Sequence, residues 1–189
     1  MKKLFTCILL FIFFLGNAIA ESKDRNVELN QLFDQLKKSK DVSTAIEIEN
    51  KIWKIWSIHP SNDRRGYRLT ELLAQGSFLM VKEELNKAYE IFSQIILVDP
   101  NWSEGWNKRA TVLYLMGKYE NSLDDIDEVL KRESRHFGAL SGQALVQIQL
   151  KNYEKAINSY KAAQKIYPSI KGAEIMIPQL QELINNESI

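Results

Sequence analysis

The fold of this chain is decided by two consecutive stretches of 34 residues, SEGWNKRATVLYLMGKYENSLDDIDEVLKRESRH (residues 103–136) and FGALSGQALVQIQLKNYEKAINSYKAAQKIYPSI (residues 137–170). When the two are placed in phase, Ser122 in the first returns as Ala156 in the second. The same step backwards leads to Ala88 and reveals an earlier copy. A fixed period of this length is typical of stacked helical repeats.

Small residues recur at two positions of each copy, and larger residues recur between them. Two helices approach closely only where the facing side chains are small, so the small positions mark a helix crossing and the larger residues fill the space around it. A proline at the end of a copy stops the helix because it cannot donate the next backbone hydrogen bond. The recurring residues are Gly76, Trp106, Ala110, Gly117, Tyr119, Ala144, Tyr153, Tyr160, the set Ala88, Ser122 and Ala156, and the prolines Pro100 and Pro168.

This pattern resembles that of the tetratricopeptide repeat family, in which Trp or Leu is followed by Gly or Ala, Tyr, Ala, a large apolar residue, Ala and Pro at set offsets. The resemblance implies an all-α solenoid built from helix-turn-helix pairs. Three residues depart from it, since Arg109 replaces the usual Leu, Gln147 a large apolar residue and Ser134 the usual Pro. We expect these departures to change local packing and to leave the fold intact.

The phase of the repeats divides the chain. The three repeats are predicted at residues 64–102, 103–136 and 137–170. Residues 27–63 are interpreted as a degenerate N-terminal helical hairpin whose second helix lies between its mate and the first repeat, and its status as a true repeat stays open. Residues 171–189 are predicted to form a capping helix, kinked or restarted near Pro178, and a tail.

The N-terminus has the composition of a secretory signal peptide over residues 1–20. Two lysines precede the apolar run Leu4–Leu15, and Ala18-Ile19-Ala20 is a small-residue cleavage site. As a helix the run would span about 18 Å, which is short of the roughly 30 Å hydrocarbon core. We therefore expect an exported chain, periplasmic or secreted, with a flexible lead-in at residues 21–26 and no stable membrane span after cleavage; an uncleaved anchor is the alternative.

Cleavage after residue 20 would remove the chain's one cysteine, Cys7, and two of its 25 basic residues, which leaves 23 basic against 24 acidic residues. Binding to a phosphate backbone requires a basic surface, so nucleic acid is not an expected partner. The sequence has no glycine-rich phosphate loop and no helix-borne histidine pair of the kind that binds zinc. We expect no cofactor, metal or catalytic residue, and we expect His59 and His136 to be solvated or capping residues.

Arg109 occupies a position that is usually apolar and partly buried, and a buried guanidinium requires a partner that offsets its lost hydration. We expect an ion pair with Asp124 or Asp127 on the facing helix. The acidic run of which these two residues are part, together with Asp125 and Glu128, is interpreted as the solvated side of that helix.

The family resemblance implies that the first helix of each pair lines a groove that binds partners. The groove residues carried over from the family pattern are Leu73, Ser77, Met80, Asn107, Thr111, Tyr114, Ser141, Leu145 and Ile148. This set is apolar and uncharged, and it lacks the Lys, Asn and Arg set with which chaperone-binding members hold a terminal carboxylate. We expect it to receive a peptide or a partner helix; the alternatives are that the N-terminal hairpin or a second copy of the chain fills it.

Two classes of function follow from the sequence. The favoured one is a non-enzymatic protein-protein interaction adaptor of the bacterial envelope. The other is a small exported hydrolase or cell-wall-binding module that uses the junction residues Arg135, His136 and Phe137. No nucleophile and base accompany that tripeptide in the sequence, which is why the adaptor is preferred.

Overall fold

The computed structural model of the chain describes residues 24–187, and every regular element in that range is an α-helix. The first helix covers residues 24–38. It is followed by α2 (Val42–Ser57), α3 (Arg64–Val81), α4 (Leu85–Val98), α5 (Ser103–Leu115), α6 (Tyr119–Arg132), α7 (Phe137–Gln149), α8 (Tyr153–Ile166) and α9 (Lys171–Glu187). The signal peptide expected at residues 1–20 lies outside the described residues.

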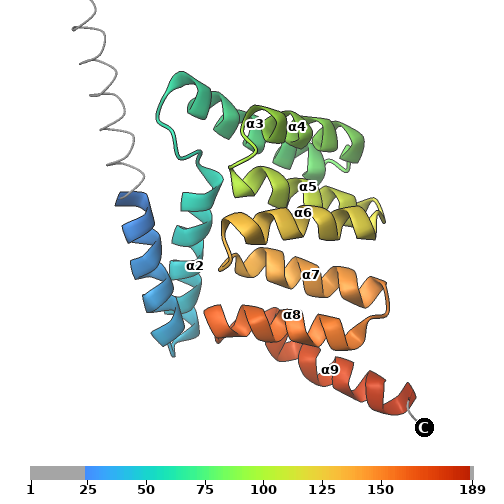
Figure 1. Ribbon diagram of the computed structural model, residues 1–189. Coiled ribbons are helices and arrows are strands. Elements are labelled where there is room, and N and C mark those ends of the chain that lie inside the picture. The colour runs from blue at the N-terminus through green and yellow to red at the C-terminus, as the bar shows by residue number, and fades with distance from the viewer. Residues whose placement is uncertain (1–23, 188–189) are drawn as a thin grey trace, which may run out of the picture.

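Helices α3 to α9 form a stack in which each helix packs on the next, with α3 and α4 at one end and α9 at the other (Figure 1). The small residues predicted at the helix crossings are buried there, since Ala88, Ala144 and Ala156 have no exposed surface. At the crossing of α5 and α6 the hydroxyl of Ser122 donates to the carbonyl oxygen of Ala110 at 2.8 Å. The predicted all-α solenoid of helix pairs is confirmed.

The turns inside the three helix pairs share one backbone conformation. Glu83, Gly117 and Lys151 are spaced by the repeat length, and their φ angles are +61°, +73° and +58°. Gly117 adopts the left-handed conformation without a steric cost, as its place in the pattern predicts, whereas the other two turns adopt it with an ordinary side chain. The backbone of each pair therefore repeats more faithfully than its sequence does.

The N-terminal hairpin, formed by the first helix and α2, does not continue the stack of helices. The first helix and α2 run across the ends of the stacked helices (Figure 1), and their apolar residues share a core with Phe137 at the start of α7 and Tyr167 at the end of α8. The expectation that α2 lies between its mate and the first repeat is wrong. The physical reason is that Ile52 and Trp56 of α2 are buried in the core that the first helix forms with these two aromatic residues, so the buried apolar side of α2 faces the ends of α7 and α8.

Polar contacts also attach the hairpin to the stack. The Tyr167 hydroxyl donates to the Glu49 carboxylate of α2 at 3.0 Å, and burial together with that carboxylate raises the pKa of Tyr167 to about 12. In the connector after α2, His59 lies 2.9 Å from the Asp99 carboxylate at the end of α4. Asp63 accepts a hydrogen bond from the Gly66 amide and so caps α3.

Helix α9 covers the last repeat. Ala173 and Leu180 of α9 are buried against α8 residues that include Tyr160. The expected restart is not found, because α9 is one helix that continues through Pro178. None of the helices within residues 24–187 has the length and apolar composition needed to cross a membrane.

Candidate functional site

A hollow of about 210 Å³ lies between α5, α6 and α7, and we call it the α5–α7 pocket. Gly138 and Gly142 of α7 line it, and a Cβ atom added at Gly142 would lie 3.9 Å from the Ile126 side chain of α6. Ala110 and Ile126 are buried beneath it, and Leu145 stands at its edge with 40% of its surface exposed. The residues that line the pocket are Asn107, Ala110, Thr111, Tyr114, Ser122, Ile126, Gly138, Ala139, Ser141, Gly142, Leu145 and Val146.

No charged residue lines the α5–α7 pocket. Its three serine and threonine hydroxyl groups donate to backbone carbonyls: Thr111 to Asn107 at 3.0 Å, Ser141 to Phe137 at 2.8 Å, and Ser122 to Ala110 at 2.8 Å. Small-molecule sites have volumes of roughly 300–1,000 Å³, and a benzene ring fits an apolar cavity of about 150 Å³. The pocket therefore has the size and chemistry to receive one apolar side chain of a larger partner.

Five of the nine residues that the family pattern places in the groove line this one pocket: Asn107, Thr111, Tyr114, Ser141 and Leu145. The other four lie elsewhere in the array. Leu73 is only 3% exposed and belongs to the core between α3 and α4, against which Met80 also packs. Ser77 donates its hydroxyl to the Leu73 carbonyl, and Ile148 packs on the core between α7, α8 and α9.

The N-terminal hairpin borders the α5–α7 pocket without lining it. A methyl group added at Gly138 would lie 2.5 Å from the Trp53 ring of α2, so α2 touches the start of α7. The pocket itself is lined by α5, α6 and α7 alone. Within the described part of the chain, the hairpin therefore leaves this section of the groove open.

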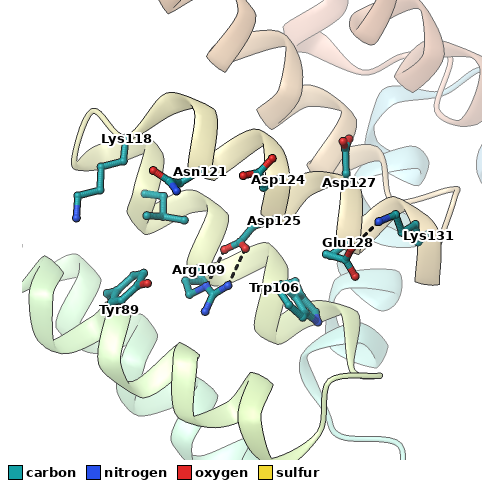
Figure 2. Close-up of a pocket in the computed structure, with 11 residues that line it drawn as sticks. Tyr89, Trp106, Arg109, Lys118, Asn121, Asp124, Asp125, Asp127, Glu128 and Lys131 are labelled. Carbon is teal, nitrogen blue, oxygen red and sulfur yellow. Dashed lines mark hydrogen bonds and ion pairs between the residues drawn. The ribbon is translucent and has the colours of Figure 1, made fainter.

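A second hollow, of about 540 Å³, lies between α4, α5 and α6, and we call it the α4–α6 cleft. Figure 2 shows the Arg109 guanidinium at its centre, directed at Asp125, with Tyr89 and Trp106 on either side. The Arg109 Nε lies 2.7 Å from the Asp125 Oδ2, and its Nη2 lies 2.8 Å from the Oδ1. Its Nη1 donates to the Ser93 hydroxyl at 3.2 Å, so each nitrogen of the guanidinium has a partner.

The expected ion pair of Arg109 is present, but its predicted partner is wrong. Asp124 and Asp127 are exposed, whereas Asp125 is 4% exposed and lies on the inward face of α6 with Ser122 and Val129. The acidic run is thus a solvated face with one buried member. The hydrogen bonds that Arg109 donates to the Asp125 carboxylate raise the pKa of Arg109, although burial acts against them.

The repeat itself contains a signal for Asp125. Residues one repeat length after Arg109 and Asp125 are Gln143 and Ser159, and they are also paired, since the Ser159 hydroxyl donates to the Gln143 side chain at 2.8 Å. The same two positions therefore hold a polar pair across the helix crossing in both repeats.

A buried polar junction joins the hairpin to the stack. His136 has no exposed surface, accepts the Ala139 amide hydrogen on its Nδ1 at 3.0 Å and thereby caps α7. Its Nε2 lies 3.3 Å from the Glu104 carboxylate, which is also fully buried. The Trp56 ring stacks on the imidazole with a centroid distance of 4.0 Å and an interplanar angle of 8°. His136 is a capping residue as expected, but neither it nor His59 is solvated.

The junction tripeptide is occupied by contacts within the fold. The Arg135 guanidinium lies 4.3 Å from the centre of the Phe33 ring and binds the Glu133 carboxylate and the Asn30 amide. Phe137 is 1% exposed in the hairpin core. With His136 and Glu104 both enclosed, the tripeptide offers a substrate no access to the imidazole. Its observed role is to hold the hairpin on the array.

Replacing Glu104 with Gln is expected to lower the free energy of unfolding by about 2 kcal/mol at neutral pH, and by less in acid. Burial by itself would raise the pKa of Glu104, but the hydrogen bond and charge of His136, the charge of Lys108 and the amide of Asn107 outweigh it and lower the pKa. The folded value lies below the unfolded value of about 4.3. The stabilisation is therefore present above that value and is lost as the pH falls through the folded pKa.

Urea denaturation of the native chain and the Glu104→Gln variant over a series of pH values measures this difference. Glu120→Gln, at an exposed position of α6, is the matched control and should leave the pH dependence unchanged. A stability gap between the native chain and Glu104→Gln that stays constant into acid would contradict the assigned role.

Within residues 24–187, no group of three or more His, Cys, Asp or Glu side chains is arranged to hold a metal ion. In the α4–α6 cleft the Glu128 carboxylate is paired with Lys131 and Arg132. The two hollows therefore differ in chemistry: the α5–α7 pocket is uncharged, whereas the α4–α6 cleft is polar, with Arg109, Asp125 and Glu128 paired inside the protein and Asp124 and Asp127 exposed.

The comparisons with known proteins agree with this geometry. Residues 139–170 match the family model described as tetratricopeptide repeat. A TPR repeat-containing protein of Rhizobium etli is 35% identical over 167 residues, which cover 88% of this chain and 78% of the relative. The chain belongs to the tetratricopeptide repeat family. In Xenopus laevis, outer dynein arm-docking complex subunit 4 is 26% identical over 114 residues, 60% of this chain and 22% of that protein.

Solved tetratricopeptide structures share the fold at low sequence identity. The crystal structure of MamA has a TM-score of 0.59 and 20% identity, and the match covers 81% of this chain and 84% of MamA. The first TPR of Spaghetti (RPAP3), bound to the HSP90 peptide SRMEEVD, has a TM-score of 0.60 and 14% identity, and covers 62% of this chain and 93% of that domain. That solved tetratricopeptide domain is thus a peptide-binding module.

Proposed function

We propose that this tetratricopeptide protein is a non-enzymatic adaptor of the bacterial envelope that binds a peptide or a partner helix in the α5–α7 pocket. The observation that carries the proposal is the uncharged hollow itself, which is lined in part by Gly138 and Gly142 and edged by the exposed Leu145. An apolar groove of this kind accepts the apolar anchor of an amphipathic helix or an extended peptide. Its lack of lining charge disfavours the acidic peptide that the RPAP3 domain binds.

The N-terminal composition of the chain supports export. A basic start, an apolar run too short to span a membrane and a small-residue site before Glu21 form the pattern that a signal peptidase cleaves. On this proposal the protein acts in the periplasm or outside the cell. Cell fractionation and the intact mass of the purified chain test this directly: a mass that begins at Glu21 supports export, and a cytoplasmic chain that retains its first residues contradicts it.

Placing carboxylates in the pocket is expected to abolish partner binding without unfolding the chain. Thr111 and Leu145 are exposed members of its lining, so Thr111→Glu with Leu145→Glu should weaken binding of an apolar anchor at least tenfold, which corresponds to about 1.4 kcal/mol. The measurement is quantitative recovery of partners from an envelope extract on the immobilised native and variant chains. Binding of each recovered partner is then repeated with purified components.

The matched control is Leu97→Glu, which introduces the same charge at an exposed leucine of α4 that lies outside the pocket. This variant should recover the same partners as the native chain. Equal recovery by the pocket variant and the control would refute the pocket as the binding site, provided that both have the native helical circular dichroism.

A further inference from the structure

The first repeat exposes a face that the later repeats bury. Val112 of α5 and Val146 of α7 occupy the same repeat position and are 0% and 1% exposed. They are buried because α5 packs on α4 and α7 packs on α6. One repeat length earlier, the same position holds Phe78 of α3, which is 60% exposed. The hairpin that could have covered it crosses the ends of the stack instead.

Phe78 belongs to a stripe that we call the α3 face, which consists of Tyr67, Glu71, Ala74, Phe78 and Val81. The alternating steps of four and three residues place all five on one side of the helix. Tyr67 is 64% and Val81 is 78% exposed, so no helix of the described chain covers the large apolar members. A solenoid end of this kind requires a polar cap or a neighbour.

The α3 face has a two-fold pattern. Tyr67 and Val81 each lie seven residues from Ala74, which has the smallest side chain of the stripe. Two copies of α3 that cross antiparallel at Ala74 place Tyr67 of each copy against Val81 of the other. The small side chain at the centre permits a close helix approach, and Phe78 fills the space beside it on both sides. This is the self-complementary arrangement of a two-fold interface.

The charges at the two ends of α3 favour the same pairing. Arg64 and Arg65 begin the helix, and Glu83 and Glu84 follow its end; all four are exposed. In the antiparallel arrangement centred on Ala74, Arg64 meets Glu84 of the other copy, so opposite charges face each other. Arg65 lies on the opposite side of α3, where its guanidinium donates to the Val98 carbonyl at the end of α4. A parallel pair would place the arginines side by side.

We propose that two copies of this protein associate through the α3 face, with their α3 helices antiparallel and crossing at Ala74. The dimer covers the apolar end of each array and joins the two arrays end to end. Its α5–α7 pockets remain open, because no residue of the α3 face lines them. The proposal is independent of what the pocket binds.

Light scattering on the purified chain over about 1 to 100 μM gives the first test. We expect a concentration-dependent dimer, and we expect Phe78→Glu to weaken it at least about 30-fold, as loss of a buried aromatic anchor does at protein interfaces. Leu97→Glu is the matched control, because position 97 is exposed and its equivalents Lys131 and Lys165 in the later repeats are exposed too. A native chain that stays monomeric over this range overturns the proposal, as does a dimer that both variants retain.

Oxidative cross-linking tests the geometry. In a Cys7→Ser background, Ala74→Cys should form a disulfide-linked dimer, because only a two-fold crossing at this residue brings the two Cα atoms within the roughly 4.4–6.8 Å that a disulfide needs. Lys161→Cys, exposed on α8, should cross-link only at the rate of random collision. Tyr67→Cys mixed with Val81→Cys should give the mixed dimer faster than either variant alone.

Equal rates for Ala74→Cys and Lys161→Cys would overturn the antiparallel pairing. Two other occupants of the face would give distinct results. If residues 1–23 of the same chain covered it, the purified chain would be monomeric and the Ala74→Cys thiol would be protected from alkylation without any cross-link. If another protein covered it, the purified chain would be monomeric and the thiol would be protected only when that protein is added.

Discussion

Replacing Trp56 with Ala is expected to lower the free energy of unfolding by about 3–5 kcal/mol, the cost of deleting a large buried aromatic side chain. Trp56 is 3% exposed and lies where the hairpin meets the array. It stacks on His136, contacts Phe33 and Phe137, and its carbonyl accepts a hydrogen bond from the Trp102 indole at 3.1 Å. At roughly 2–4 °C per kcal/mol for a chain of this size, the melting temperature should fall by about 10 °C.

The matched control is Trp56→Phe. The Nε1 of Trp56 is buried without a hydrogen-bond partner, so the substitution removes an unsatisfied donor and keeps most of the ring. We expect it to cost less than about 1.5 kcal/mol. Denaturant unfolding measures the loss of unfolding free energy in each variant. Amide hydrogen exchange locates the loss in the chain, and Trp56→Ala should reduce protection first in residues 24–57. Equal costs for Ala and Phe would contradict the role of the ring as the hairpin's anchor.

The second large effect on stability is expected at the Arg109–Asp125 ion pair. Asp125→Asn alone should destabilise the chain by about 3 kcal/mol, because it leaves a partly buried guanidinium without its carboxylate. Replacing both residues with Leu should bring stability back to within about 1 kcal/mol of the native chain, since a well-packed apolar pair avoids the cost of burying two charges. A double-mutant cycle on urea denaturation measures the coupling.

A second Arg–carboxylate pair in the same repeat serves as the control. The Arg132 and Glu128 side chains are 2.7 Å apart and are 21% and 28% exposed, against 18% and 5% for Arg109 and Asp125. Solvent weakens such a pair, so a double-mutant cycle that replaces Arg132 and Glu128 with Leu should show a weaker coupling than the cycle on Arg109 and Asp125. Equal coupling in the two cycles would show that burial of Asp125 is not what makes its pair strong.

Much of the fold could be predicted because the same residue pattern of a packed helix pair occurs three times along the chain. Each helix pair needs small side chains at its crossing, so Ala88, Ser122 and Ala156 locate the crossings without reference to coordinates. The helix boundaries follow from the same period. The partner-binding groove stays a prediction: five of its nine proposed residues line one pocket, whereas Leu73 lies in the core because α3 packs there directly on α4.

The candidate site was less predictable wherever a residue contacts something outside its own repeat. His136 and Tyr167 stand at repeat boundaries, and both contact the hairpin. At the position of Tyr167 the earlier repeats hold Asp99 and Glu133, and this change of residue type was the available signal that another segment docks there. It could not reveal which segment docks or in which direction.

The sequence by itself determined the helix pairs, their order and their stacking. In a periodic chain each helix pair packs on the next pair, which has the same residue pattern and lies 34 residues further along the chain. Only the tertiary structure decided the path of the hairpin, the enclosure of His136 with Glu104 and the exposure of the α3 face. Residues 24–63 have no second copy with which to be aligned, and the position of a single segment depends on which of several apolar surfaces it covers best. The whole fold determines that position, and no helix of the described chain covers the α3 face at one end of the array.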